Sequence, residues 1–594
     1  MRLRIRNILR SPLIRQGAAV VVLLSLLFTL QAIRDPRIRN VHYLYNGTKG
    51  ETKSLPLLLK VSGTGMLSVW FNLDLTESQG TVFTLQIDDC ARKLWINGRQ
   101  VTRPPCKNGR AVDRDLKPYL IAGSNSVRVL IQDVKKGEIG LDLSLPISSP
   151  VIRWPGIAAM VVILLYAVSL FSATLGRKNP LLTALFAGGG LLRLLYVSVT
   201  PYDVRGHDVT SHIDYIKYLV QHHWFPPAQA GWEFHQPPLY YALMSPLLAI
   251  PKKLGISPTL GLSWIQYASF FLSITTLFVA CWIGILLFRR KSERLSLALF
   301  CLLIATFPAL ILFASRINND VLYQFSAFLF LALLLRWWNV GTTRAALLTT
   351  LAIALGFLTK ASAFLFLPVF WLLVALRPKT PLRHKLRWIL LSGIGVALIA
   401  GWFIAIRYQE HDYVRLLSFG GGMRRELTLT TSWRTFLVFN PLAVILQPFT
   451  SVWSDASGRP FFWVFFFKTS LFGQFSYLPV LRPFASLLAA LALGLLPILA
   501  AGIVRAVRSR DSARTPLLLT LVLVLAAAIT YRILHPQSPN QDFRFSILLV
   551  PIGAYFAAWA LRTPRRLPRA LMATWLILFM SASTLFFLML FAFS

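Results

Sequence analysis

Long apolar runs separated by short charged segments make up most of the chain. A run of about 20 apolar residues spans the roughly 30 Å hydrocarbon core of a bilayer as a helix, and about thirteen runs here approach that length. The pattern therefore predicts a polytopic α-helical membrane protein. The expected spans lie near 16–33, 155–176, 180–199, 260–288, 294–315, 321–338, 344–359, 361–376, 388–407, 484–505, 515–531, 545–561 and 569–592.

Residues 41–150 follow a different pattern. Apolar and polar side chains alternate from Leu67 to Leu73, and turn signals such as Asn97-Gly98 separate short runs. Alternation with closely spaced turns is typical of an all-β sandwich. We therefore predict a cytoplasmic N-terminus and first span in residues 1–40, an extracytoplasmic β-sandwich in 41–150 and a transmembrane domain in 151–594.

Composition supports a membrane setting, with 55% hydrophobic residues, 14% charged residues and mean hydropathy +0.60. The net charge of +38 would suit a nucleic-acid partner if it formed one surface. Instead, Lys and Arg concentrate in alternate connections such as 289–294, 377–387 and 562–569, while 316–320 and 532–544 hold few. This is the positive-inside pattern, and it indicates a multi-pass protein without a nucleic-acid partner. We expect a bacterial inner (plasma) membrane, with a periplasmic catalytic face.

The polar stretch from Tyr202 to Tyr241 stands out in so apolar a chain. It holds five of the nine histidines and several carboxylates, directly after an expected span. Ionisable residues at a membrane boundary need a functional reason. We predict two outer loops, 200–259 and 408–483, and assign catalysis to the first. Within it, 238–250 is too short to span and is expected to lie at the interface.

Several short motifs fall in the order found in one superfamily. They are the acidic segment around Asp208, the sequence Pro237-Pro238-Leu239-Tyr240-Tyr241, the turn Arg316-Ile317-Asn318-Asn319-Asp320, and Gly356-Phe357-Leu358-Thr359-Lys360. Together they resemble the GT-C glycosyltransferases, which include bacterial aminoarabinose transferases and dolichyl-phosphate-mannose protein mannosyltransferases. One departure is that His207-Asp208 stands where relatives usually show an acidic pair. Residues 93–131 also resemble the jelly-roll sugar-binding domains of β-galactosidase-like glycosidases; packing on the membrane domain is the alternative role for this β-domain.

The resemblance implies a polyprenyl-phosphate-linked sugar as donor and an extracytoplasmic glycan, lipid or protein as acceptor. The acceptor hydroxyl must lose its proton, which suits a carboxylate base. The leaving phosphate gains charge, which suits Arg or Lys. A single displacement inverts the anomeric centre.

Asp208 is the favoured base, with Asp203 as the alternative. A helix after Asp208 would place His212 on the same face. Either aspartate could instead cap that helix. His207, Asp208 and His212 could also hold a divalent metal, although interfacial histidines are more often hydrogen-bonded than metallated.

Four cations are candidates for the donor phosphate: Arg193, Lys360, Lys468 and Arg544. Arg193 lies inside an apolar span, so it should face the bundle interior. Lys360 could simply extend toward the interface. The aromatic run Phe461–Phe467 suits an isoprenoid tail or a plain aromatic belt. Expected substrate-binding residues are His207, His235, Gln236, Tyr240, Asp320, Gln541 and Asp542, where Asp542 could only neutralise Arg544.

Two rival functions remain. A lipid-linked glycan transporter or flippase should show paired repeats and broken helices; we expect neither, because the polar clusters gather at one face. A membrane-anchored glycan-binding assembly protein would use the β-domain and would not require Asp208. Cys90 and Cys106 fall in the β-domain, where a disulfide is permitted, while Cys281 and Cys301 lie in apolar spans.

Overall fold

The computed structural model describes most of the chain, in two compact units. The first comprises Met1–Val162 and Met244–Tyr267, and the second comprises Ile163–Leu243 and Ala268–Ser594. The described residues are 12–34, 37–52, 55, 57–61, 64–75, 82–87, 90–101, 112–132, 137–144, 150–177, 179–254, 258–410, 425–509 and 511–594.

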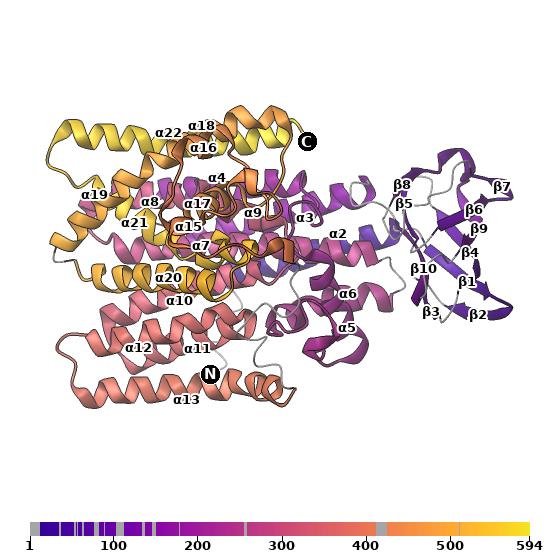
Figure 1. The fold of residues 1–594 in the computed structure, drawn as a ribbon, viewed down its shortest axis with the longest axis horizontal. Coiled ribbons are helices and arrows are strands. Elements are labelled where there is room, and N and C mark those ends of the chain that lie inside the picture. The colour runs from indigo at the N-terminus through magenta and orange to yellow at the C-terminus, as the bar shows by residue number, and fades with distance from the viewer. Residues whose placement is uncertain are drawn as a thin grey trace. The chain divides into compact units, whose positions relative to one another are not determined.

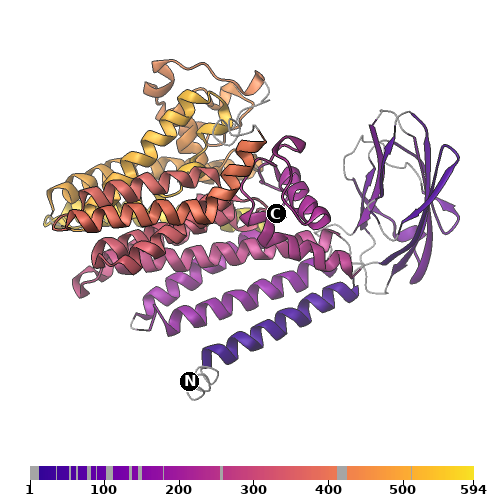
Figure 2. The ribbon, with the colours of Figure 1, turned by 90° about the horizontal axis from the view of Figure 1, so that it is seen from below.

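The first unit contains two antiparallel sheets, drawn as two layers of strands in Figure 2. One has the order β2-β1-β4-β9-β6-β7 and the other β3-β10-β5-β8. The strands are β1 (Arg37–Tyr45), β2 (Thr48–Thr52), β3 (Leu57–Val61), β4 (Met66–Leu75), β5 (Val82–Ile87), β6 (Cys90–Ile96), β7 (Arg99–Gln100), β8 (Val112–Asp115), β9 (Gly123–Gln132) and β10 (Gly137–Ser144).

The alternation seen in the sequence explains how the two sheets pack. Leu67, Val69, Phe71 and Leu73 of β4 are buried, whereas Trp70 between them is exposed. Side chains from both sheets enclose the same small apolar space, so the inner faces form one core. Asn97 and Gly98 both have positive φ (51° and 77°) and join β6 to β7 as a two-residue hairpin turn. The predicted sandwich is confirmed.

The disulfide prediction lies outside what the structure describes, because Cys106 falls in 102–111. Cys281 and Cys301 are free and buried. In the first unit, helix α2 (Pro12–Arg34) is tied to α7 (Pro258–Leu287) by a buried hydrogen bond from Trp264 Nε1 to Gln31 Oε1 at 3.0 Å.

The second unit is helical, and its long helices run side by side in Figure 1. The longer helices that lie wholly or partly in it are α3 (Pro150–Ala173), α4 (Pro180–Ser198), α5 (Val209–His222), α6 (Leu239–Lys253), α7 (Pro258–Leu287), α8 (Arg294–Thr306), α10 (Asp320–Val340), α11 (Thr343–Thr359), α12 (Phe366–Leu376), α13 (Leu382–Gln409), α17 (Phe462–Phe472), α18 (Arg482–Leu493), α19 (Leu495–Arg508), α20 (Arg514–Leu534), α21 (Leu549–Ala560) and α22 (Arg566–Ala592). The shorter helices are α9 (Pro308–Leu312), α15 (Trp433–Leu437) and α16 (Pro441–Leu446).

Eight helices among the described residues are long and apolar enough to cross a membrane, or up to ten if two bent pairs each count as one span. The chain is thus a multi-pass membrane protein. The other three predicted spans correspond to the shorter apolar helices Gln16–Ala32, Thr343–Thr359 and Ala361–Leu376. The predicted count of thirteen is not confirmed.

Two of the predicted spans correspond to bent helix pairs rather than to single straight helices. Lys291–Thr306 and Pro308–Ser315 meet at 49°, and Ser538–Ser546 and Leu549–Ala560 meet at 56°. The first break has a local cause: Pro308 has no N–H to continue helix α8, and Phe307 before it is extended (ψ 123°). Each bent pair contains or directly precedes polar residues that the site uses.

Helices α10 and α11 form an antiparallel hairpin with a clear sequence origin. Gly341 ends α10 in the left-handed conformation (φ +62°), and the Thr342 side chain accepts a hydrogen bond from Ala345 N to begin α11. The helices are 21 and 17 residues long. Because their lengths are similar, Asp320 at the start of α10 and Lys360 just after α11 lie at the same end of the hairpin.

Candidate functional site

A polar cavity of about 670 Å³ lies at that end of the hairpin, within the second unit. Its walls come from segments far apart in the sequence. They lie within 206–236, 451–453, 474–475 and 531–545, together with Asn319-Asp320, Lys360 and Leu427. The outer turns predicted from the sequence therefore converge on one cavity.

Asp208 lines this cavity and is exposed. It occupies the N-cap position of α5, yet its side chain makes no capping hydrogen bond. Its backbone is left-handed (φ 49°, ψ 32°), which is uncommon for a residue with a Cβ. The carboxylate is therefore not used as a helix cap and faces the cavity.

A buried carboxylate, Asp320, binds two of the predicted cations. Lys360 Nζ donates to Asp320 Oδ1, and Arg544 Nη1 lies 3.3 Å from Asp320 Oδ2. Both cations also lie against the ring of Phe545, at 4.8 and 4.9 Å. Asp320 is only 2% exposed. The cluster thus has two positive charges for one buried negative charge, before Asp208 and Asp542 are added.

Arg544 keeps hydrogen-bonding capacity in this arrangement. Its Nε is buried and has no hydrogen-bond partner among the described residues. A guanidinium has five N–H donors, and an unpaired buried donor is costly. The local turn is fixed by Asp542, whose Oδ1 accepts from Arg544 N at 2.9 Å. Arg544 also lines the cavity, so its guanidinium charge faces an anionic ligand placed there.

Amide side chains tie the walls together. Asn319 Nδ2 donates to Gln236 Oε1 at 3.1 Å and to Thr359 O at 3.2 Å. Gln236 Nε2 also lies 3.2 Å from His235 Nε2. These hydrogen bonds therefore hold together the first polar stretch, the 316–320 turn and the end of α11, beside Lys360.

The two site histidines are neutral for the same physical reason. Burial lowers the pKa of His212 to about 3 and lowers that of His207 well below its usual value, with Arg544 adding to the effect on His207. His207 Nε2 lies 3.6 Å from Asp542 Oδ2. His212 Nδ1 bonds the Tyr241 hydroxyl at 2.8 Å. The helical spacing of Asp208 and His212 is present, but His212 pairs with Tyr241.

Glu233 is a third acid in the cavity, beside Asp208 and Asp320, and the sequence did not single it out. It is 8% exposed. Burial raises its pKa to about 7, and the nearby charge of Asp208 contributes to that rise against the opposing effect of Lys360 and Arg544. A carboxyl that titrates near neutral pH can hold or release a proton under working conditions.

Other predicted residues lie elsewhere. Arg193 is buried and donates to Gly189 O and Ala305 O at 2.9 Å each, and to Ser273 Oγ, away from the cavity walls. Lys468 donates to Ser457 O at 2.8 Å and is also absent from the walls. Asp203, Tyr240, Gln541 and Asp542 do not line the cavity either. Asp542 instead supports Arg544 and His207.

A metal at the site is not supported by the donor set. In the part of the chain that the structure describes, no group of three or more His, Cys, Asp or Glu is placed to hold a metal ion. The Nδ1 of His212 is already used by Tyr241. The site's chemistry is therefore derived from carboxylates and cations.

Two exposed tryptophans at the cavity were also missed. Trp232 and Trp453 are 49% and 55% exposed and line its walls. Exposed tryptophan in so apolar a chain gives no local signal, because interfacial belts contain it too. Arg407 was missed as well: it donates to Pro226 O and Phe234 O at 3.0 and 2.6 Å and so fixes the loop before Gln236.

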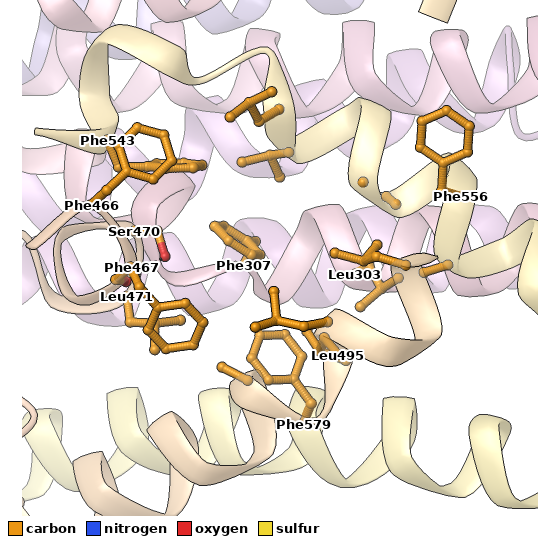
Figure 3. A pocket seen from close by; sticks show the side chains of 18 of the residues that line it. Leu303, Phe307, Phe466, Phe467, Ser470, Leu471, Leu495, Phe543, Phe556 and Phe579 are labelled. Carbon is orange, nitrogen blue, oxygen red and sulfur yellow. Dashed lines mark hydrogen bonds between the residues drawn. The ribbon is translucent and has the colours of Figure 1, made fainter. Parts of the chain in front are cut away.

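A second cavity, of about 430 Å³, is apolar, and some of its lining residues are sequence neighbours of residues that line the polar cavity. Phe466, Phe467 and Phe543 line it, and Figure 3 shows their rings with those of Phe307 and Phe579. Phe543 belongs to this cavity, whereas the next residue, Arg544, belongs to the polar cavity. The predicted aromatic run thus borders an apolar cavity. Another residue of that cavity, Phe543, directly precedes the cation Arg544.

No protein-family model and no curated protein sequence matches this chain. Among solved structures, the apo oligosaccharyltransferase of Archaeoglobus fulgidus has a TM-score of 0.40 and 13% identity, covering 69% of this chain and 56% of its own. The same organism's AglB in complex with an inhibitory peptide and a dolichol-phosphate gives a TM-score of 0.39 at 13% identity and the same coverage.

The arabinosyltransferase EmbB of Mycobacterium smegmatis has a TM-score of 0.32 and 10% identity, covering 93% of this chain and 53% of its own. This chain therefore spans little more than half the length of these proteins. Their names are those of glycosyltransferases, the class that the sequence motifs resemble. At TM-scores below 0.5 such likeness does not decide a function, and the residues of the site must do so.

Proposed function

We propose that this protein is a membrane glycosyltransferase that moves a sugar from a polyprenyl-phosphate donor to an acceptor hydroxyl. One observation carries the proposal. A single cavity holds an exposed carboxylate that caps nothing, Asp208, and a guanidinium with an unused buried donor, Arg544. Group transfer from a phosphate needs these two functions, a base and a cation.

Asp208 acts as the general base. The acceptor O–H proton passes to the Asp208 carboxylate as the new bond from oxygen to the anomeric carbon forms. The bond from that carbon to the phosphate oxygen breaks in the same step, so the anomeric centre inverts. Burial lowers the pKa of His207 and His212 and so makes both weak bases, which leaves the carboxylates that line the cavity.

Arg544 and Lys360 meet the leaving phosphate. Cleavage turns a singly charged phosphodiester into a monoester that gains negative charge, and fixed cations stabilise that gain in a site of low dielectric. Asp320 orients both cations and offsets part of their charge. Arg544 lines the cavity and uses Nη1 for Asp320, so it can bind the phosphate without losing Asp320.

The apolar cavity accepts the first isoprene units of the donor. Phe543 and Arg544 are consecutive, so a phosphate at Arg544 would place its lipid chain beside the aromatic side chains around Phe466. Burial of apolar chain atoms supplies roughly 0.8 kcal/mol per CH₂. Trp232 and Trp453 would contact the sugar, since an indole ring packs on the apolar face of a pyranose.

The acceptor is an extracytoplasmic glycan, lipid or protein. We place the cavity outside the cytoplasm of a bacterial inner membrane because the connections rich in Lys and Arg belong to the opposite end of the spans.

The two broken helix pairs also suit a lipid-linked glycan transporter, which uses broken helices at its substrate site. The two functions differ in product. A transporter moves the intact donor across the bilayer, whereas a transferase separates sugar from lipid phosphate.

The test is donor turnover in liposomes. The purified protein is mixed with a panel of radiolabelled polyprenyl-phosphate sugars and an envelope extract as acceptor. Label that appears in acceptor, with release of polyprenyl phosphate, supports the transferase. Label that changes leaflet while it stays on the lipid favours the transporter and contradicts the proposal.

A further inference from the structure

A row of side chains crosses the outer face of the six-stranded sheet. Strand pairing places His42 of β1 opposite Trp70 of β4, and Trp70 opposite Arg128 of β9. Arg128 in turn pairs with Trp95 of β6. Glu51 of β2 and Gln100 of β7 continue the row at its two ends. One line perpendicular to the strands thus holds two tryptophans with an arginine between them.

The row faces away from the sandwich core. Trp70 is 36% exposed, while its neighbours Val69 and Phe71 are buried. Arg128 is exposed between buried Val127 and Val129. Trp70 and Trp95 are two strand spacings apart, or roughly 10 Å. Trp70 is exposed and Trp95 is half-buried, and two indoles at this separation across a sheet can contact alternate rings of an extended saccharide.

The rings are already arranged by neighbouring side chains. The His42 ring stacks on Trp70 with centroids 5.9 Å apart. Arg128 Cζ and Lys93 Nζ lie 5.7 and 5.9 Å from the Trp95 centroid. Cation–π contacts of this kind hold an aromatic ring in one orientation, so less rotamer freedom is lost on binding.

Charge on this face is uneven. Arg39 is paired with Asp74 at 3.1 Å, and His42 lies 3.7 Å from Glu51. Arg128 and Lys93 have no carboxylate partner among the residues that the structure describes. Two cations beside Trp95 therefore remain available, and Arg128 offers the planar donor pair that suits carboxylate or phosphate.

We propose that this row is a binding site for an acidic glycan, with Trp70 and Trp95 stacking on sugar rings and Arg128 and Lys93 binding its carboxylates or phosphates. The site belongs to the β-sandwich and goes beyond the proposed transfer reaction. It would hold an anionic polysaccharide on the protein independently of the polar cavity.

Cross-strand packing is the simpler role for these residues, because aromatic and cationic pairs also stabilise sheets. The two roles predict different outcomes. Residues that only stabilise the sheet change the melting temperature when replaced, whereas a binding site changes affinity in variants that melt normally.

The experiment measures binding of polygalacturonate and of neutral dextran to the full-length protein in zwitterionic nanodiscs. Wild type should bind polygalacturonate, with an affinity that falls as salt rises, and should not bind dextran. Trp70→Ala and Trp95→Ala should each weaken binding about tenfold or more. Arg128→Gln should weaken it and Arg128→Lys should retain part of it. Met66→Ala is the matched control and should bind as wild type. Met66 lies on β4, the strand of Trp70, on the same outer face, and is 39% exposed.

Three results would overturn the proposal. The first is no binding of polygalacturonate by wild type, or equal binding of dextran. The second is equal loss in Met66→Ala, or unchanged affinity in both tryptophan variants. The third is equal binding of poly-glutamate or phosphatidylglycerol vesicles through the same residues, which would mean that this face binds any polyanion and does not recognise sugar rings. Arg128→Gln keeps the test decisive if a tryptophan variant fails to fold.

Discussion

Glu233→Gln tests the electrostatics of the cavity. Glu233 is 8% exposed, and burial together with the charge of Asp208 raises its pKa from 4.5 to about 7. In the unfolded chain the carboxyl ionises near 4.5. Between these values the folded protein holds a proton that the unfolded chain releases, so stability falls as pH rises through this window.

The magnitude follows from the difference between the two values. Each pKa step corresponds to about 1.36 kcal/mol, so above pH 7 the ionised, buried Glu233 costs on the order of 3 kcal/mol. A glutamine side chain at this position would keep the size and much of the hydrogen bonding but cannot ionise. Glu233→Gln should therefore be more stable than wild type at pH 8 and similar to it at pH 4.5.

The assay is the apparent melting temperature of the purified protein in detergent, scanned at one rate from pH 4.5 to pH 8.5. The difference between variant and wild type should grow between pH 4.5 and pH 7 and then level off. Glu51→Gln is the control, because the Glu51 side chain is 81% exposed and should give no such difference. A Glu233→Gln variant that melts below wild type at pH 8, or in parallel with it at every pH, would refute the reasoning.

Three further changes test the cations and the lipid site. Arg544→Gln should lower the transfer rate about 10²- to 10³-fold, measured with labelled sugar donor, because the leaving phosphate loses a cation. Arg508→Gln, at an exposed arginine in the last turn of α19, is the control. Equal transfer rates in the two variants would contradict the role of Arg544. Lys360→Met should destabilise the fold by about 3–5 kcal/mol by leaving Asp320 short of one cation, and adding Asp320→Asn should recover folded yield, whereas no recovery would exclude charge as the cause. Gly553→Leu, which adds a side chain at the wall of the apolar cavity, should slow transfer from long-chain donors more than from short-chain donors; an equal effect on both would contradict the lipid site.

The helical elements could be predicted because an apolar run in a bilayer has few structures open to it. Only a helix or a closed barrel pairs every backbone polar group without water. The Asn97-Gly98 hairpin was equally local, since both residues tolerate positive φ. The break at Pro308 had a local signal too, in the proline itself.

The site was only partly predictable, because long-range contacts decide which side chains share a cavity. Asp208, Asp320, Lys360 and Arg544 lie in or beside turns that the sequence placed on one side of the spans, and these turns meet at one cavity. Arg193 could not be excluded, because its bond to Ala305 O joins residues 112 positions apart.

Glu233 is a site residue that the sequence could not single out, because its role also depends on long-range contacts. Its position in the polar stretch was plain, but its burial and its nearness to Asp208 arise only in the fold. His212 likewise carries no sign in the sequence that Tyr241 will take its ring nitrogen.

The central claim is that Asp208 removes the acceptor proton. The most direct test compares the transfer rate of wild type, Asp208→Asn and Asp214→Asn, each shown to melt normally, with the labelled donor that turns over best. Asp214 lies on the same helix, half-exposed beside Lys217 at 3.6 Å, and serves as the matched control. Asp208→Asn should lower the transfer rate about 10²- to 10⁴-fold, and Asp214→Asn should change it little. A rate in Asp208→Asn close to that of wild type would contradict the account.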